Sequence, residues 1–425
     1  MAEMGSHIDV LSEKPVRRRR TIAGGAFIVA GTAVGAGMFS MPVVTSGIWF
    51  SYSLLLLMIV GFCMYSASLY LLEVNLRFPR GAGFDTMVHH FFGRWGQVIN
   101  GVSVAFVCYV LTYAYISGGS SIVTHSVSAI NGANLSPEAG SLIFSVCLGA
   151  VVIAGTWFVD RVSTVLVGGM LITFASFVFG ILDFSEPARL FPCITVSEAL
   201  PYSLMTLPFM AVSFGIQNCI PSLTRYFDKD SRAVRKSVFC GTLLALLFYC
   251  VWQAGIFSNL SREQFPAVIK RGGNIGALLA ALKANGLSSQ IYYLLQLFSH
   301  MAVASSFLGV SLSLFDYISD LFGFSDNLAG RLKTGAVTFL PPTLLGMFLP
   351  DGFIKAIVFA GLGAVVFAIL VPVLMAYMAR QQEYSPGDFK VSGGSVRMFI
   401  VGLFGVVVFI LSLLEILSLL PAFGH

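Results

Sequence analysis

The chain has 425 residues, of which 56% are hydrophobic and only 11% are charged, and its formal net charge is +5. An average soluble domain carries about 25% charged residues, so a chain of 45.7 kDa with so few charges cannot form a water-exposed surface. The composition excludes a soluble globular enzyme, a disordered chain and a fibrous repeat, and it indicates an integral membrane protein.

The first 20 residues are polar and end in four arginines, so we expect a cytosolic N-terminal tail over 1–20. The remainder, 21–421, is interpreted as one domain of successive apolar runs. Each run can cross a hydrocarbon core of about 30 Å as a helix, whereas barrel strands are shorter and alternate polar with apolar residues. We place eleven runs, at 22–48, 50–76, 98–127, 140–158, 162–182, 197–221, 237–258, 287–322, 332–349, 353–378 and 397–419.

Lysine and arginine orient these runs, because cytosolic loops are enriched in both residues. With a cytosolic N-terminus, nineteen of the 25 lysines and arginines fall on the cytosolic side and six on the outer side. Eleven crossings then place His425 outside. The basic charge is therefore a topology signal, and we expect a lipid bilayer and a small-molecule substrate as partners, not nucleic acid.

Two of the runs contain residues that interrupt helices, at 31–42 (GTAVGAGMFSMP) and 207–221 (LPFMAVSFGIQNCIP). They occupy matching places if the chain has two five-helix halves, about 22–182 and 197–378, followed by an extra helix at about 397–419. Because each half has an odd number of helices, the second is inverted relative to the first. Paired broken helices in inverted halves indicate a substrate site at the middle of the membrane.

Unwound backbone at this depth leaves N–H and C=O groups that lipid cannot satisfy. Free N–H groups suit a carboxylate, and free C=O groups suit an ammonium group or a metal cation. The two breaks together therefore favour a zwitterion such as an amino acid. The alternative is that the glycines only permit close helix packing and the prolines only kink the helices.

Four stretches carry a family resemblance: 27–43 (FIVAGTAVGAGMFSMPV), 111–118 (LTYAYISG), 302–325 (AVASSFLGVSLSLFDYISDLFGFS) and 330–343 (GRLKTGAVTFLPPT). In them the chain resembles the bacterial hydroxy/aromatic amino acid permease family, which includes the tryptophan and tyrosine permeases. The resemblance implies an all-α integral membrane fold with eleven transmembrane helices in a LeuT-like 5+5 inverted repeat. It also implies uptake of tryptophan or tyrosine across the bacterial inner membrane, usually by proton symport and without a resident cofactor.

The chain departs from this family at two positions. Members usually carry a histidine in the sixth helix and a lysine in the fifth, where this sequence has Gln217 and Met170. Neither replacement can carry a proton. The coupling ion is therefore open between a proton, which the resemblance favours, and sodium.

Residues at the first break are the candidates for binding the substrate carboxylate. Gly35, Ala36 and Gly37 are small enough for a ligand to reach their backbone N–H groups. Phe209 and Phe214 flank the second break, where a ring contact with an aromatic substrate is worth about 0.5–1.5 kcal/mol beyond area burial. Ordinary core packing is the alternative for each aromatic residue.

Polar side chains near the breaks are the candidates for substrate selectivity. Gln217 or Asn218 can hydrogen-bond a phenol or an indole N–H. Tyr109 and Tyr113 lie four residues apart on one helix face, and either hydroxyl can point toward the polar end of the substrate. A packing role is the alternative for both tyrosines.

Two alternatives are open for the coupling ion. His300 is the only ionisable residue in the middle of the eighth run, and with an ordinary pKa near 6.5 it can carry a proton; a neutral histidine bonded to a carbonyl is the alternative. Ser305 and Ser306, with backbone carbonyls near Gly31 and Val34, supply the oxygen ligands that sodium requires.

Charged residues at the cytosolic ends of helices form the last group of candidates: Asp316, Asp320, Arg331, Lys333, Glu73 and Arg77. We interpret the first four as a network for topology and gating. Glu73 and Arg77 have the favourable i,i+4 order of a structural pair.

Other function classes lack their motifs in this sequence. It contains no P-loop, no HExxH, no GxSxG and no clustered His/Asp/Glu metal set, so we expect neither an ATP-driven pump nor an enzyme. A non-transporting membrane sensor built on a transporter fold is a remote alternative. Such a sensor is expected to add a large soluble domain, whereas the longest polar tail here is the first 20 residues.

Overall fold

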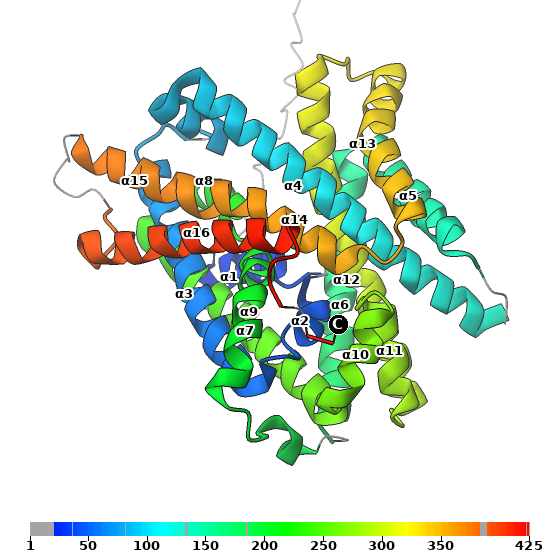
Figure 1. Cartoon of the computed structure of the whole chain (residues 1–425). Coiled ribbons are helices and arrows are strands. Elements are labelled where there is room, and N and C mark those ends of the chain that lie inside the picture. Colours follow the sequence, from blue (N-terminus) through cyan, green and yellow to red (C-terminus); the bar gives the residue numbers. More distant parts are fainter. Residues whose placement is uncertain are drawn as a thin grey trace, which may run out of the picture.

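A computed structural model describes residues 21–424 apart from 36, 81, 132–134, 184–185, 383–388 and 422. The described residues are folded entirely as helices and connecting turns (Figure 1). The expected tail 1–20, Ala36 and the C-terminal His425 lie outside them.

The first half of the chain contains α1 (Ile22–Ala33), α2 (Gly37–Val44), α3 (Trp49–Asn75), α4 (Phe84–Asn131), α5 (Pro137–Ala154) and α6 (Thr156–Asp183). The 3-10 turn η1 (Pro187–Leu190) leads to α7 (Val196–Ser213), η2 (Gln217–Cys219), α8 (Ile220–Tyr226) and α9 (Ser231–Asn259). Next come η3 (Arg262–Gln264), α10 (Phe265–Lys270), α11 (Ile275–Ala284), α12 (Ser289–Phe322) and α13 (Leu328–Phe348). The chain ends with α14 (Phe353–Val365), the π-helical turn η4 (Val366–Leu370), α15 (Val371–Gln381) and α16 (Gly394–Ile416).

Nine helices in the described residues are long and apolar enough to cross a membrane, or up to ten if the bent pair α1–α2 is one span. The expected run at 332–349 forms α13, which has 21 residues but is not one of the nine. Side chains such as Phe179 and Phe399 are 76% and 69% exposed, which suits contact with lipid tails and not with water. The chain is therefore a multi-pass membrane protein, and the count of eleven crossings stays a prediction.

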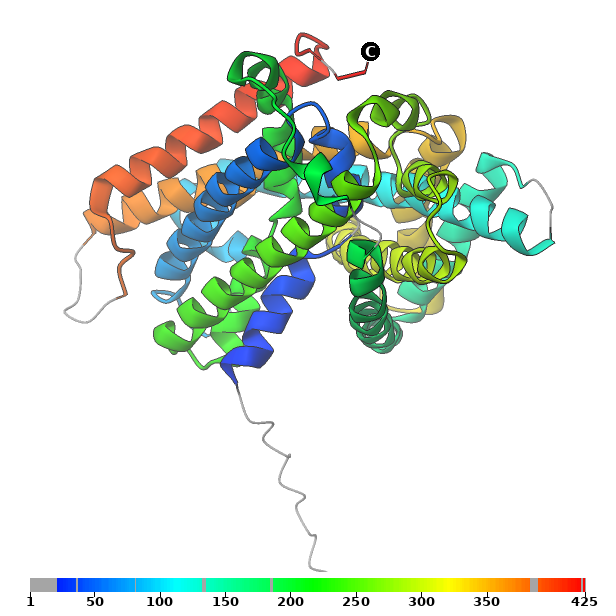
Figure 2. The same ribbon diagram turned by 90° about the horizontal axis from the view of Figure 1, so that it is seen from below.

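Both expected breaks separate helices. The axes of α1 and α2 differ by 57°, and Val34 between them is extended, with φ −76° and ψ 94°. The second break follows Ser213, where the backbone leaves the helix at Phe214 before η2 begins. α1 lies alongside α9 (Figure 2), and α2 packs against both α7 and α9, so the two breaks are neighbours.

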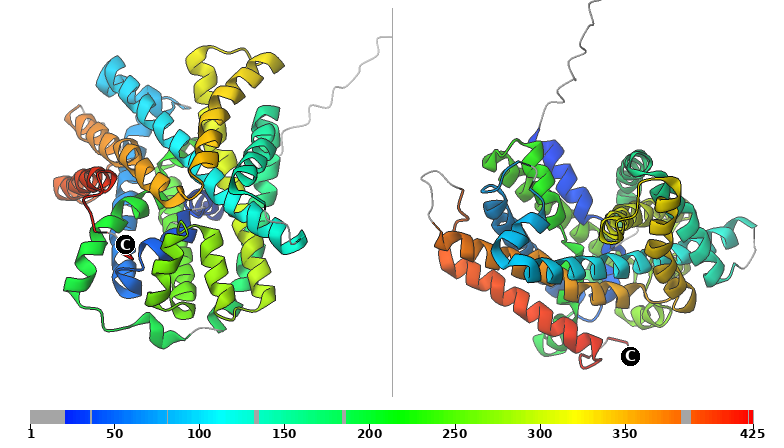
Figure 3. Two further views of the ribbon diagram at one scale, coloured as in Figure 1. Left: turned by 45° about the vertical axis from the view of Figure 1, so that its right-hand side comes forward. Right: turned by 90° about the horizontal axis from the view of Figure 1, so that it is seen from above.

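Long helices surround this centre. α4 bends at Gly93, whose φ of 64° and ψ of −164° only glycine adopts readily. It packs along α14 and against α12 and α5 (Figure 3). The continuous run α14–η4–α15 lies beside α16, as Figures 1 and 2 show.

An aromatic cluster fixes α2 against α6, α9 and α12. The ring of Phe39 lies 5.6 Å from Trp252 and 5.3 Å from Phe298, and Phe298 lies 5.1 Å from Phe177. All three contacts are edge-to-face, a geometry worth about 0.5–1.5 kcal/mol per pair beyond area burial. The cluster holds the segment after the first break in a defined position.

Candidate functional site

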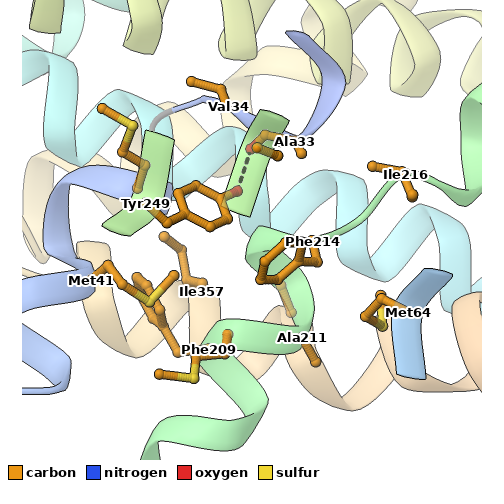
Figure 4. Packing of buried hydrophobic residues seen from close by; sticks show 14 of the residues in the cluster. Ala33, Val34, Met41, Met64, Phe209, Ala211, Phe214, Ile216, Tyr249 and Ile357 are labelled. Atoms are coloured by element: carbon orange, nitrogen blue, oxygen red, sulfur yellow. Dashed lines mark hydrogen bonds between the residues drawn. The ribbon is translucent and has the colours of Figure 1, made fainter. Parts of the chain in front are cut away.

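The two helix breaks meet at the hydroxyl group of Tyr249 on α9. This oxygen lies 2.7 Å from the carbonyl oxygen of Ala33, the bond dashed in Figure 4. It lies 2.5 Å from the carbonyl oxygen of Ser213. Ala33 is the last residue of α1 and Ser213 the last residue of α7. The carbonyls at the ends of both helices therefore converge on one buried phenol, which the sequence did not single out.

The two glycines at the first break approach serine side chains closely. A Cβ atom on Gly35 would lie 2.5 Å from Oγ of Ser306, and one on Gly37 would lie 3.0 Å from Oγ of Ser213. Ser306 also hydrogen-bonds Tyr115 on α4. A side chain at position 35 would therefore displace the Ser306 hydroxyl from the break, and binding of a carboxylate at these N–H groups stays a prediction.

Of the two aromatic residues predicted to flank the second break, Phe214 contacts Tyr249 directly. It is fully buried, and its ring meets that of Tyr249 edge-on, with centroids 4.9 Å apart and planes at 84°. Phe209 is also fully buried, one turn earlier on α7, near Met41 and Ile357 (Figure 4). Phe214 therefore borders the site, whereas Phe209 packs behind it.

The neighbouring amides Gln217 and Asn218 have different environments. Gln217 is 2% exposed, and its Nε2 donates to the carbonyl oxygen of Met64 on α3 at 3.3 Å, while Asn218 is exposed. A carbonyl oxygen can only accept a hydrogen bond, so the amide nitrogen of Gln217 faces Met64. Oε1 of Gln217 is then buried without a hydrogen-bond partner among the described residues.

Tyr109 and Tyr113 point their hydroxyls at backbone carbonyls of the α13 region. Tyr109 donates to Val337 at 3.0 Å and Tyr113 donates to Leu349 at 2.8 Å. Both are engaged in packing between α4 and α13. The tyrosine of α4 that faces the break is Tyr115.

His300 belongs to a hydrogen-bonded group that joins α12 to α4. Its Nε2 lies 3.0 Å from Oγ of Ser126, which also accepts from Nε2 of Gln296 at 3.0 Å and donates to the carbonyl of Ile122 at 2.8 Å. Because the Ser126 proton is directed to Ile122, Nε2 of His300 is the donor. In the neutral ring this assignment leaves Nδ1 without a proton, and proton coupling by His300 stays a prediction.

The candidate sodium ligands are only partly brought together. Oγ of Ser305 donates to the carbonyl of Ala302 in its own helix at 3.1 Å, whereas Ser306 faces the break at Gly35. Val34 is buried in the break, and Gly31 is exposed one turn earlier. The sodium site stays a prediction.

Comparison with known proteins identifies the family. The model of the tryptophan/tyrosine permease family matches residues 18–412. The chain belongs to this family. It is 45% identical to a tryptophan-specific transport protein of Haemophilus influenzae, over 91% of this chain and 94% of that protein. Proteins with the same description from Pseudomonas aeruginosa and Shigella flexneri are 44% and 41% identical, over 96% and 95% of this chain and 97% of each relative.

At the fifth-helix position where the resemblance implies a lysine, this family member has Met170, which is 2% exposed on α6. α6 approaches α12 closely there, since a Cβ atom on Gly169 would lie 2.4 Å from Sδ of Met301. An apolar contact between α6 and α12 therefore occupies this part of the permease.

The charged residues around Arg331 join α13 to α5. Arg331 pairs with Asp326 at 2.6 Å and donates to the carbonyls of Ile153 and Val152. Asp316 is exposed within electrostatic range of Arg331 and Asp320. Lys333 is exposed. Arg331 therefore connects α13 to α5 through these two carbonyls. Gating by Asp316 and Asp320 of α12 stays a prediction.

Glu73 on α3 forms a buried ion pair with Arg380 on α15, with Nε–Oε1 and Nη2–Oε2 distances of 2.7 Å each. The backbone N–H of Val391 also donates to Glu73 at 2.8 Å. Arg77, the partner expected from the i,i+4 spacing, donates to the carbonyl of Ala379 at 2.5 Å. Arg380 is thus a bidentate partner of Glu73 that the sequence did not indicate, and the structural role of Glu73 stays a prediction.

Proposed function

We propose that this chain is a secondary transporter that imports an aromatic amino acid, with tryptophan as its preferred substrate, by proton symport across the bacterial inner membrane. Near-full-length relatives described as tryptophan-specific transport proteins support the substrate class. The main structural support for a substrate site at the two breaks is that the carbonyls of Ala33 and Ser213 converge there.

The backbone polarity at the breaks matches the charges of an amino acid. The carbonyls at the C-terminal ends of α1 and α7 carry partial negative charge and attract the ammonium group. The N-terminal end of α2 at Gly37 carries partial positive charge and attracts the carboxylate. Phe214 then lies where it can cover the aromatic side chain of the substrate.

Gln217 is the proposed source of selectivity for tryptophan. An indole N–H is a donor only, and Oε1 of Gln217 is a buried acceptor without a partner in the described structure. Phenylalanine supplies no donor and would leave this acceptor unsatisfied. Discrimination by a missing donor is stronger than discrimination by size alone.

His300 is the proposed proton carrier, since Met170 and Gln217 cannot titrate. Its bond to Ser126 fixes the ring and leaves Nδ1 to take up and release the proton. With the N-terminus in the cytosol and the C-terminus outside, protonation from the outer side and release to a more alkaline interior would drive uptake.

Competition experiments test the substrate assignment. Uptake of labelled tryptophan by proteoliposomes is measured against unlabelled tryptophan, tyrosine, phenylalanine, alanine and lysine, with and without sodium. We expect tryptophan to compete best, tyrosine less well, and alanine and lysine not at all, independently of sodium. Competition by alanine or lysine that equals that of tryptophan would refute the proposal.

A further inference from the structure

Tyr249 contacts both halves of the proposed ammonium site at once. Its hydroxyl lies within hydrogen-bonding distance of two carbonyl oxygens, those of Ala33 and Ser213, but a phenol has only one proton to donate. Among the described residues, the two acceptors therefore share this proton, or one of them lacks a side-chain donor. An ammonium group has three donors and a positive charge, and it can satisfy both carbonyls fully.

The position of the phenol is fixed by its surroundings. Tyr249 is 0% exposed, and the edge of Phe214 holds its ring at a centroid distance of 4.9 Å. Figure 4 shows the hydroxyl directed at Ala33, with Phe214 beside the tyrosine ring. The packing around the ring therefore holds the phenol hydroxyl at the two carbonyls.

We propose that the Tyr249 hydroxyl occupies the place of the substrate ammonium group before substrate binds. The hydroxyl bonds the carbonyls of Ala33 and Ser213 until the amino acid arrives, and it then gives up at least one of these two bonds. The inference rests on the proposed function. It makes Tyr249 a positioning residue that holds the two breaks together without substrate and sets the substrate affinity by competing with it.

The competition determines the effect of removing the hydroxyl. In Tyr249→Phe the two buried carbonyls lose their donor in the substrate-free protein, and an ammonium group restores it. We therefore expect lower thermal stability without substrate, tighter tryptophan binding by roughly five-fold or more, and a larger tryptophan-induced rise in Tm. Indole-3-propionate has no ammonium group, so its affinity should not improve.

The matched control is Tyr109→Phe, which removes a phenol hydroxyl that donates to one backbone carbonyl, that of Val337 at 3.0 Å, in the packing between α4 and α13. It should not tighten tryptophan binding. Weaker binding of tryptophan to Tyr249→Phe, or equal changes for tryptophan and indole-3-propionate, would overturn the inference. A sodium ion could also occupy the carbonyls, so binding is measured in potassium and in sodium buffers. If sodium alone raises Tm, and raises it further in Tyr249→Phe, the two carbonyls bind a metal cation and the inference is overturned.

A second measurement covers the case in which Tyr249→Phe does not fold. A 3-fluorotyrosine introduced at position 249 gives one fluorine resonance, which should shift with tryptophan and not with indole-3-propionate. A resonance that tryptophan does not move would overturn the inference. Failure of the wild-type protein to bind or transport tryptophan would instead refute the proposed function, so the two failures are distinct.

Discussion

Glu73 and Arg380 are 307 positions apart in the chain and form a two-bonded ion pair that joins α3 to α15. The side chain of Glu73 is fully buried and that of Arg380 is 12% exposed. A carboxylate in this environment is stable only with its partner, because a lone buried charge has lost its hydration. The pair therefore fixes the distance between these two helices.

We expect Glu73→Ala to lower the stability by about 3–5 kcal/mol, because it leaves the Arg380 guanidinium buried without its carboxylate. Thermal unfolding in detergent measures the loss. Arg80→Ala is the control, since Arg80 pairs with Asp228 at 2.8 Å but the two side chains are 68% and 44% exposed. That pair should contribute about 0–1 kcal/mol. Equal shifts in Tm for both variants would contradict this interpretation.

The approach of α12 to the first break predicts the effect of adding side chains there. Gly35→Ala would place a methyl group 2.5 Å from Oγ of Ser306, so we expect it to push this hydroxyl away from the break and to reduce tryptophan uptake. Gly37→Val should abolish uptake by crowding Ser213 and the adjacent N–H groups.

Gly309→Ala is the matched control for these variants, since it adds the same methyl group on α12 where no atom lies within 4 Å. All three variants should appear in the membrane at normal levels. Wild-type tryptophan affinity in Gly37→Val would eliminate the proposed carboxylate site.

The unpartnered oxygen of Gln217 predicts a specific response to a modified substrate. 1-Methyltryptophan cannot donate from its indole nitrogen, so we expect it to compete roughly 5- to 150-fold less well than tryptophan, which corresponds to about 1–3 kcal/mol for one buried unsatisfied acceptor. Gln217→Leu should remove most of that difference. Asn218→Leu is the control, because Asn218 is the exposed neighbouring amide. A loss of discrimination in the Asn218 variant alone would show that Asn218, and not Gln217, recognises the indole N–H, and would contradict this prediction.

The bonded group around His300 predicts how coupling is lost. In His300→Ala the proposed proton carrier is absent, so proteoliposomes should still exchange external for internal tryptophan but should not accumulate it under a pH gradient. His125→Ala is the control, because His125 is an exposed histidine of α4 outside this group. Accumulation that needs sodium and is insensitive to the His300 substitution would show that sodium is the coupling ion.

The sequence indicated both breaks correctly, because glycine and proline are concentrated near 31–42 and 207–221. It did not indicate Tyr249, which lies in an ordinary apolar run with no local feature that distinguishes it. Only the packing of α9 against α1, together with the approach of the Tyr249 hydroxyl to the end of α7, brings this hydroxyl to the two carbonyls.

Spacing along one helix was also an incomplete guide to contacts. Tyr109 and Tyr113 share a helix face, as expected, but α13 covers that face and engages both hydroxyls. The i,i+4 rule suggested Arg77 for Glu73, whereas the bidentate partner comes from α15. Such choices depend on which helices become neighbours, and one helix alone does not contain that information.

The most direct test of the central claim is the uptake of labelled tryptophan by proteoliposomes that contain the purified chain, with an alkaline interior and no sodium. We predict transient accumulation above the external concentration, which a protonophore abolishes and unlabelled tryptophan competes away. Absence of tryptophan and tyrosine uptake from liposomes in which the same protein moves alanine or lysine would contradict the assignment.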